Sequence, residues 1–371
     1  MKTEEKKEII ITIERFRKAG GTESYMFDLI RSFAQRGIKV HVYADKFDTS
    51  LDTYPLIIPH TINLKYIPKP LRIFFFYRFF NKQRLQGVPV ITFNYTDNAD
   101  ILICGGNRLG YLNANNNSLD TRQVGCFDKW QINRERAAFK SVRTIVAHSE
   151  LMKEELIKYY GIAAEKVTIL YPPIDTSRFE VLGEEARRTI RARYGWKEEK
   201  TVFLFPSIGH KRKGFEVLAS FFANTDLPVK LAVAGTPIEQ SMRNVESLGF
   251  CDNMPELYNA VDYTAMASEY EPFGLVGIES VLCGTPIVFS KNMACREVFN
   301  DKAGIFFDRN SPKALRAAIE EAVVRKEKGG ARLTKPKECL KYDPTIERHI
   351  ESLLKYLEKI EVKKIQYEIS Y

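Results

Sequence analysis

The sequence predicts an α/β protein of two doubly wound domains, each a parallel sheet covered by helices. Three observations predict this fold class. The chain has 371 residues, more than one hydrophobic core usually serves. From residue 8 onward, short apolar runs alternate with amphipathic helical patterns. The alternation breaks at the Pro-Pro pair of "ILYPPID" (169–175) and then restarts, so we place a domain boundary there.

The first half supplies the elements of one parallel sheet. The expected strands are "EIIITI" (8–13), "KVHVYA" (39–44), "DILIC" (100–104) and "TIVAHS" (144–149). The expected helices are 22–37, closed by Gly37, and 149–161. Because these strands are apolar on both faces, we expect helices on both sides of the sheet.

The second half repeats the pattern after a polar helix at 183–195. Its expected strands are "TVFLFPS" (201–207), "KLAVAG" (230–235), "DYTAMAS" (262–268), "PIVFS" (286–290) and "GIFF" (304–307). The predicted domains are therefore 1–175 and 176–350, with a C-terminal helix, 351–371, that packs back toward the first domain. Folds of this kind bind ligands at the carboxyl ends of their strands, so we expect a ligand cleft between two facing sheets.

Composition excludes several classes of protein. Apolar residues make up 44% and charged residues 28%, which is typical of a globular protein. The six cysteines form no C-x-x-C pair, which argues against a zinc site and a disulfide framework. No apolar run reaches the roughly 18 residues of a membrane span, and the N-terminus lacks the apolar stretch of a secretory signal. We therefore expect a cytoplasmic protein.

The positive charge is concentrated in the first half. Of the net charge of +9, residues 1–175 carry +7 and the remaining residues carry +2. The first half is therefore the part expected to meet an anionic partner. No nucleic-acid-binding motif is present, so nucleic acid is not expected as a partner. An anionic membrane surface or a phosphorylated acceptor fits this charge better.

The segment "PKPLRIFFFYRFFNKQRL" (68–85) has six aromatic residues between positions 74 and 80. As a helix it is apolar nearly all round, so it could be a core helix of the first domain. Its basic residues also suit a helix that lies against an anionic membrane surface. These basic residues are Arg72, Arg78, Lys82 and Arg84. The sequence leaves both alternatives open.

The stretch "EYEPFGLVGIES" (269–280) places two carboxylates, Glu271 and Glu279, around the start of a helix. It could be a buried helix with two surface acids. It could also hold a nucleotide sugar, because the free N–H groups of Gly274, Leu275 and Val276 suit a phosphate. Glu279 lies five residues after Gly274, about 7 Å along the axis at about 1.5 Å per residue, where it would accept the ribose hydroxyls. Glu271 lies before the helix, where the sugar would sit.

The E-x7-E arrangement of "EYEPFGLVGIESVLCGTPIV" resembles the family-4 retaining glycosyltransferases of the GT-B fold. Other features of that family follow in the same order along nearly the whole chain. They are Gly20-Gly21, "TIVAHSELMKEEL", "VTILYPPIDTSRF", "PSIGHKRKG", "VAG" (233–235), "MPELYNAVDYTAMAS" and Glu297 in "CREVF". The ordered set is specific although each short motif is weak, and it is most similar to glycosyltransferases of the lipopolysaccharide core.

The resemblance implies a role for each matching residue. Glu271, Arg212 and Lys213 would be catalytic, with the two cations stabilising the leaving diphosphate. Glu279 would hold the ribose. Further donor contacts would come from Gly20, Gly21, His210, Phe273, Gly274, Leu275 and Val276. The glycine pair could also be an ordinary strand–helix turn.

The chain departs from the family pattern near the expected sugar position. Many members carry a histidine or aspartate after the fourth strand of the first domain, where this chain has Asn107 and Arg108 in "CGGNRLGYL". These two are candidate acceptor-side residues, and the group that would support the oxocarbenium ion is left open. His148 is expected to be structural.

The resemblance implies a retaining enzyme that moves a sugar from a nucleotide-diphosphate sugar, expected to be a UDP-sugar, to a cell-envelope glycolipid or oligosaccharide. No D-x-D triplet occurs, so we expect neither a metal nor another cofactor. We also expect peripheral attachment to the inner face of the cytoplasmic membrane. The alternatives are a non-catalytic scaffold of the same fold and a transferase with a soluble sugar acceptor. The lack of G-x-G-x-x-G after the first strand lowers the case for a dinucleotide oxidoreductase.

Overall fold

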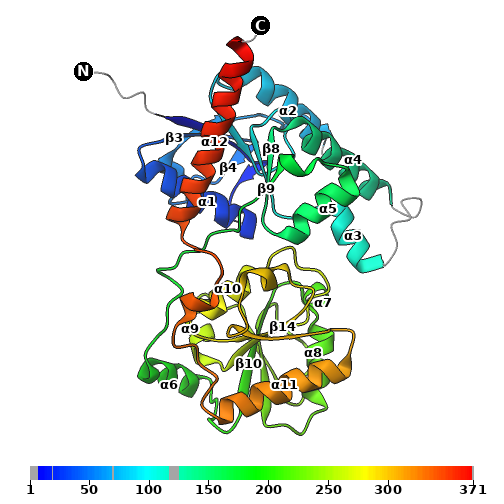
Figure 1. Ribbon diagram of the computed structural model, residues 1–371, viewed down its shortest axis with the longest axis vertical. Helices are drawn as coiled ribbons and strands as arrows, with labels where there is room; N and C mark the ends of the chain where they lie inside the picture. The colour runs from blue at the N-terminus through cyan, green and yellow to red at the C-terminus, as the bar shows by residue number, and fades with distance from the viewer. Residues whose placement is uncertain (1–6, 19, 69–70, 117–124, 370–371) are drawn as a thin grey trace. The chain divides into compact units, whose positions relative to one another are not determined.

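The computed structural model describes residues 7–18, 20–68, 71–116 and 125–369. The chain forms two compact units, each built around a parallel sheet (Figure 1). The first unit comprises residues 1–173 and 344–371, and the second comprises residues 174–343. The sequence placed the boundaries after residues 175 and 350, and in the structure they lie after residues 173 and 343.

The first unit has a seven-stranded parallel sheet in the order β5-β3-β1-β6-β7-β8-β9. Its strands are β1 (Glu8–Thr12), β3 (Lys39–Ala44), β5 (Ile57–Thr61), β6 (Val90–Thr92), β7 (Ile101–Cys104), β8 (Thr144–Ala147) and β9 (Val167–Ile169). A separate two-stranded sheet pairs β2 (Arg15–Phe16) with β4 (Lys46–Phe47). The helices are α1 (Gly21–Gln35), α2 (Arg72–Gln83), α3 (Arg108–Asn116), α4 (Cys126–Ser141), α5 (Glu150–Tyr160) and α12 (Ile346–Ile369).

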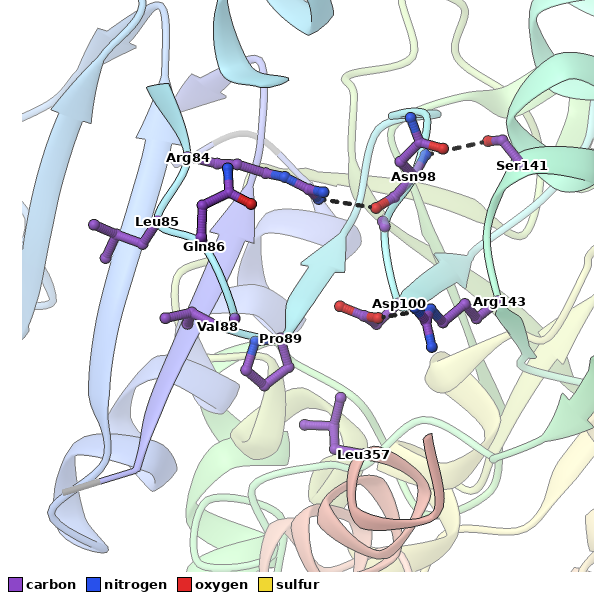
Figure 2. Close-up of a pocket in the computed structure, with 12 residues that line it drawn as sticks. Arg84, Leu85, Gln86, Val88, Pro89, Asn98, Asp100, Ser141, Arg143 and Leu357 are labelled. Atoms are coloured by element: carbon purple, nitrogen blue, oxygen red, sulfur yellow. Dashed lines mark hydrogen bonds and ion pairs between the residues drawn. The ribbon is translucent and has the colours of Figure 1, made fainter. Parts of the chain in front are cut away.

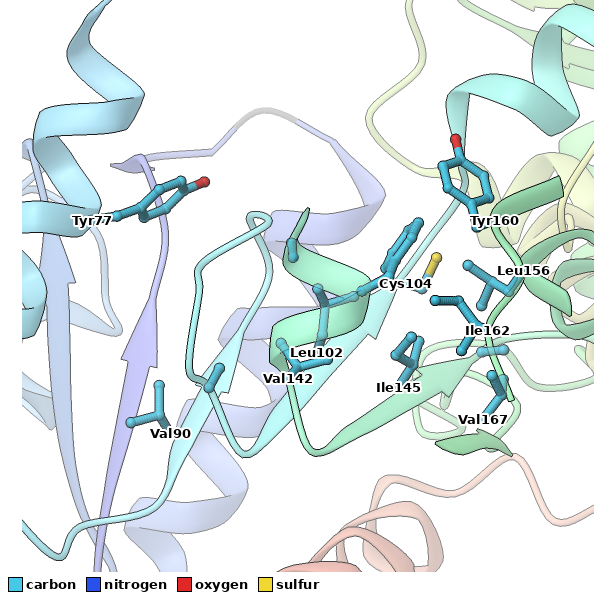
Figure 3. Close-up of a cluster of buried hydrophobic side chains, with 14 of the residues drawn as sticks. Tyr77, Val90, Leu102, Cys104, Val142, Ile145, Leu156, Tyr160, Ile162 and Val167 are labelled. Atoms are coloured by element: carbon cyan, nitrogen blue, oxygen red, sulfur yellow. The ribbon is translucent and has the colours of Figure 1, made fainter. Parts of the chain in front are cut away.

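Alternate side chains of the central strands enter two different cores, because successive residues of a strand point to opposite faces of the sheet. Ile9 and Ile11 of β1 pack with α1 and α12, which lie side by side on one face (Figure 1). Ile10 enters the core on the other face, to which α2, α4 and α5 contribute (Figure 3). Both faces are therefore covered, as the apolar strands predict.

The segment 68–85 contains the helix α2, whose two faces differ. Phe76, Tyr77 and Phe80 are buried in the core of the first unit. Phe74 is 61% exposed, and Arg78 and Lys82 are exposed on the same face at four-residue spacing. The helix is therefore a core helix on one side and an exposed aromatic and basic surface on the other.

The second unit has a six-stranded parallel sheet in the order β12-β11-β10-β13-β14-β15. Its strands are β10 (Thr201–Ser207), β11 (Val229–Gly235), β12 (Val245–Gly249), β13 (Tyr263–Met266), β14 (Ile287–Ser290) and β15 (Gly304–Phe307). Its helices are α6 (Glu184–Arg193), α7 (His210–Lys213), α8 (Phe215–Ala223), α9 (Met254–Ala260), α10 (Leu275–Leu282) and α11 (Pro312–Glu327). The five strands predicted here are all present.

Within the described part of the chain, no helix is long and apolar enough to cross a membrane.

Candidate active site

The site residues of the second unit gather where β10 and β13 end. β10 runs into the short helix α7, which carries Arg212 and Lys213. β13, paired with β10, runs into the segment that carries Glu271 and leads into α10. Because neighbouring parallel strands end at the same edge of a sheet, residues almost 60 positions apart meet here.

The loop that carries Glu271 is held by backbone hydrogen bonds to the 293–295 segment. The amide of Ala294 donates to the carbonyl oxygen of Glu271 at 3.0 Å, and that of Cys295 donates to Phe273 at 2.8 Å. Gly274 then has a φ of +100°, a left-handed conformation that favours glycine. This turn starts α10 at Leu275 and presents the N-terminal end of the helix beside Glu271.

The helix N-terminus has the character expected of an anion site. The first intrahelical bond runs from the Gly277 amide to the Gly274 carbonyl at 3.0 Å. The amides of Leu275 and Val276 come before it and have no carbonyl of the helix to bind. Leu275 and Val276 are half-buried, and their N–H groups lie at the positive end of the helix dipole.

Arg212 and Glu271 form an ion pair, with Nη1 and Oε2 2.9 Å apart. The Arg212 side chain is 38% exposed and that of Glu271 is 16% exposed, so the pair is open to a ligand on the arginine side. Arg212 Nη1 also donates to the carbonyl of Tyr270 at 3.2 Å. The cation and the acid predicted to act together are therefore in direct contact, and an incoming phosphate would compete with Glu271 for the guanidinium.

Lys213 interacts electrostatically with both acids. Its Nζ donates to the carbonyl of Pro206 at 3.2 Å. Burial lowers the pKa of its ammonium group, and the negative charges of Glu271 and Glu279 oppose that shift. The lysine is thus a largely desolvated cation within electrostatic range of both carboxylates, and such a cation interacts strongly with a phosphate.

Glu279 is held by a tyrosine that the sequence analysis did not single out. The hydroxyl of Tyr258, on α9, donates to Glu279 Oε2 at 2.6 Å. Burial raises the pKa of the Glu279 carboxyl, whereas this hydrogen bond and the charges of Lys213 and Arg178 act to lower it. Tyr258 and Glu279 are 21 residues apart on different helices, so no local spacing could have identified the pair.

His210 supports its own loop. Its Nε2 lies 2.9 Å from the carbonyl oxygen of Thr236, which can only accept, and its Nδ1 lies 3.1 Å from Ser207 Oγ. Both ring nitrogens therefore have partners inside the second unit. These contacts hold the ring in place beside the basic loop, and the donor contact predicted from the sequence stays a prediction.

The glycine pair of the first unit lies at the start of α1. The Gly20 amide donates to Glu23 Oε2 at 3.0 Å, and Gly21 is the first residue of the helix. A methyl group added at Gly21 would meet no described atom within 4 Å, and one at Gly20 would meet only the Glu23 carboxylate, at 3.6 Å. Packing within the described chain therefore does not require glycine here, which leaves close approach of a ligand as a reason for it.

Asn107 and Arg108 are bound within the first unit. Asn107 Nδ2 donates to Glu155 at 2.6 Å, and Asn107 Oδ1 accepts from the Gly110 amide at 2.7 Å. The Arg108 side chain donates through Nε to Asp128 at 2.7 Å. Asn107 therefore stabilises the start of α3, and Arg108 ties α3 to α4. Their contact with an acceptor stays a prediction.

His148 lies beside the start of α1 and is buried, as expected of a structural residue. Its ring packs edge-on against Tyr25 at 5.3 Å, and its Nε2 has no partner among the described residues. Tyr25 in turn bonds His349 of α12 at 2.5 Å, and His349 Nδ1 lies 3.0 Å from the carbonyl of Tyr171. This cluster joins α1, α12 and the segment around Tyr171, near the end of residues 1–173 of the first unit. No group of three or more potential metal ligands occurs in the described part of the chain.

Comparison with known proteins assigns the fold and the family. A model described as "Glycosyltransferase Family 4" matches residues 19–178, and one described as "Glycosyl transferases group 1" matches residues 186–334. A probable transglycosylase of Burkholderia thailandensis is 35% identical over 349 residues, which are 93% of this chain and 95% of that protein.

Two solved structures show the same fold at low sequence identity. One is WaaG, a glycosyltransferase involved in lipopolysaccharide biosynthesis, with a TM-score of 0.73 at 18% identity over 87% of this chain and 93% of that one. The other is HepE of Anabaena, in complex with UDP and glucose, with a TM-score of 0.73 at 15% identity over 95% and 100%. The two parallel-sheet domains are therefore those of a GT-B glycosyltransferase. The chain belongs to glycosyltransferase family 4.

Proposed function

We propose that this glycosyltransferase moves a sugar from a nucleotide-diphosphate sugar, with UDP as the expected nucleotide, to a cell-envelope glycolipid such as the lipopolysaccharide core. The observation that carries the proposal is the meeting of Arg212, Lys213, Glu271 and Glu279 around the N-terminus of α10. Two cations and a helix dipole suit a diphosphate, and two carboxylates suit the hydroxyls of a sugar and a ribose.

Each group has a distinct task in the proposed reaction. Glu279, held by Tyr258, accepts the ribose hydroxyls, and the amides of Leu275 and Val276 bind the diphosphate. Glu271 holds the transferred sugar. Arg212 is held beside the site by its ion pair with Glu271 before the donor arrives. When the donor binds, the guanidinium shares its hydrogen bonds between Glu271 and the diphosphate.

The proposed step is a front-face substitution that retains the anomeric configuration. The acceptor oxygen bonds to the anomeric carbon as the bond from that carbon to the phosphate oxygen breaks. The acceptor proton passes to the leaving phosphate, so the nucleoside diphosphate leaves with it. Arg212, Lys213 and the α10 dipole stabilise the charge that develops on that phosphate. No metal enters this proposal.

Two of the structural neighbours support the choice of substrates. HepE was solved with UDP and glucose, which favours a UDP-sugar donor. WaaG is involved in lipopolysaccharide biosynthesis, which favours a glycolipid acceptor at the inner face of the cytoplasmic membrane. The exposed face of α2, with Phe74, Arg78 and Lys82, is the surface that we propose for peripheral attachment to anionic lipid.

A direct assay tests the proposal. The protein is incubated with a panel of UDP- and GDP-sugars, with and without extracted envelope glycolipid, and the anomeric configuration of the product is read by NMR. We expect transfer from a UDP-sugar with retention. Glu271→Ala should lower kcat more than donor affinity, because its carboxylate acts at the reacting sugar.

The control for the assay is Glu256→Ala, which removes a carboxylate that pairs with Arg193 on the outside of the same unit. Its kinetics should match the wild type. If the enzyme transferred the sugar only to a soluble sugar and not to the glycolipid, the proposed acceptor would be wrong and a soluble acceptor would take its place. A folded protein with neither donor hydrolysis nor transfer would favour the scaffold alternative and defeat the proposal.

A further inference from the structure

A cavity of about 420 Å³ opens in the first unit. Its walls are the segments 84–89, 98–100 and 141–143, which lead into β6, β7 and β8 (Figure 2). They lie at the amino ends of these strands, whereas Gly20 and Gly21 follow the carboxyl end of β1. A ligand in this cavity would therefore be distinct from one that contacts the glycine pair.

Two arginines extend toward this cavity from different walls (Figure 2). Arg84 Nη1 donates to the carbonyl of Asn98 at 3.1 Å, and Arg143 Nε pairs with Asp100 at 3.2 Å. Each guanidinium is anchored through one nitrogen. Arg84 Nη2 and both Nη atoms of Arg143 have no partner among the described residues, so they can donate to a ligand.

The charge of the cavity is positive. The single acid in its lining, Asp100, is already engaged, because one carboxylate oxygen accepts from the Val90 amide at 2.9 Å and the other faces Arg143. Arg84 has no carboxylate partner among the described residues. Gln86 and Ser141 add polar groups to the lining. An anion with several acceptor oxygens matches this set.

The walls of the cavity are held by the backbone. The Arg143 amide donates to the carbonyl of Ala99 at 3.2 Å, and the Ile10 amide donates to Pro89 at 2.8 Å. Gly87 and Asn98 have φ values of +77° and +58°, which set two tight turns in the wall. The loops that carry the two arginines are therefore held in place before a ligand arrives, and this reduces the entropic cost of binding.

We propose that this cavity binds the phosphate group of a phosphorylated ligand. Guanidinium groups bind phosphate through pairs of parallel hydrogen bonds, and the volume is that of a small-molecule site. Leu357 of α12 lies in the lining, so a bound ligand would contact both the sheet loops and the returning C-terminal helix. Binding would then stabilise the first unit by holding α12 in place.

Hydrogen exchange read by mass spectrometry tests this proposal with inorganic phosphate as the probe and chloride at equal ionic strength as the reference. We expect phosphate to slow exchange in peptides that cover 84–90, 98–100 and 141–143. Arg84→Gln and Arg143→Gln should each raise the phosphate concentration that gives half of the maximal protection by about tenfold. Arg243→Gln, which removes an exposed arginine of the second unit, is the matched control.

The location of the protection separates this site from the transferase site, because peptides around Arg212 and Gly274 report on the latter. Phosphatidylglycerol and phosphatidylcholine vesicles form a second arm. Protection of the cavity by phosphatidylglycerol alone, lost in the arginine variants, would identify a lipid headgroup as the source of the phosphate. No protection of the three wall segments by either probe, or equal protection in folded Arg84→Gln and Arg143→Gln variants, would overturn the proposal.

Discussion

At the scale of single residues, Glu279 and Tyr258 make a prediction about the pH dependence of donor binding. The Tyr258 hydroxyl lowers the pKa of a carboxyl that burial raises. Tyr258→Phe should therefore raise the pKa of Glu279 further, so that the carboxylate is protonated at a higher pH. Under the proposed function, UDP affinity should fall with decreasing pH in both proteins, and the midpoint should lie higher in the variant.

Calorimetric titration of UDP between pH 5 and 8 measures this shift. Glu279→Ala should weaken binding by about 1–3 kcal/mol at pH 8 and remove the pH dependence that Glu279 causes, because no carboxylate is left to accept the ribose hydroxyls. Tyr194→Phe, in the same unit but stacked on Trp196, serves as the control tyrosine. Identical pH profiles for wild type and Tyr258→Phe would show that the hydrogen bond does not tune Glu279.

The buried histidines predict how stability depends on pH. Burial lowers the pKa of His148 from 6.5 to about 3 and that of His349 from 6.5 to about 4. As pH falls below 6.5, the unfolded chain binds protons at these histidines and the folded chain does not. The free energy of unfolding therefore falls between pH 6.5 and about 4, by up to about 3 kcal/mol for each histidine.

His148→Phe tests this linkage because its ring can keep the edge-on contact with Tyr25 while it loses the unpartnered Nε2. Urea unfolding at pH 7.0, 5.5 and 4.5 gives the free energies of unfolding of the first unit. Between pH 7.0 and 4.5, the fall in the free energy of unfolding that the two histidines cause should be roughly half as large in the variant as in the wild type. An unchanged difference between pH 7.0 and 4.5 would mean that His148 titrates normally in the folded chain.

At the scale of elements, α2 predicts weak attachment to an anionic membrane. The structure narrows the basic set by exposure, because Arg72 and Arg84 are half-buried whereas the other two cations are exposed. Arg78 and Lys82 remain on the exposed face with Phe74. Each cation near an anionic leaflet contributes about 1 kcal/mol, so removing both should weaken attachment by about 2 kcal/mol, roughly 30-fold.

Sedimentation with phosphatidylglycerol vesicles compares wild type with the double variant Arg78→Gln and Lys82→Gln. The matched control is Lys313→Gln with Arg316→Gln, two exposed cations of α11 in the second unit. We expect only the α2 variant to lose binding. Equal pelleting of both variants and wild type would leave α2 as a core helix whose outer face has no membrane role.

At the scale of the whole molecule, the return of the chain predicts that the first unit depends on the last helix. Ile350, Leu353 and Leu357 of α12 are buried in the core formed with α1. Each buried aliphatic side chain contributes about 1.5–3 kcal/mol, and the total stability of a domain is about 5–15 kcal/mol. A chain that ends at residue 345 should therefore lose most of the stability of its first unit.

Urea unfolding resolved by hydrogen exchange measures each unit separately. Peptides from α1 and β1 should exchange rapidly in the shortened chain, while those from β10 and β13 should keep their protection. A chain that ends at residue 359 retains the three core residues and provides the control. Unchanged protection of α1 in the chain ending at 345 would show that α12 contributes little to the first core.

Several features followed from the sequence alone because they depend on local order. Short continuous apolar runs located β1 and β3, and helical patterns located α1 and α5, each within a few residues, because the order of apolar side chains reports which positions are buried. The glycine before α10 and the acids on either side of it were also visible, because a helix start and its spacing are set by neighbours in the chain. The GT-B fold and the glycosyltransferase family came from the order of such motifs.

Other features were decided only by the tertiary structure, because they are contacts between distant segments. Asn107 and Arg108 have their partners on α5 and α4, which spacing could not reveal. The Tyr258 bond to Glu279 and the Arg212 pair with Glu271 depend on which strands are neighbours in the sheet. Which face of α2 is buried depends on the sheet against which it packs. Local pattern sets the elements, whereas the free energy of burying them against one another selects their partners and leaves particular side chains free for chemistry.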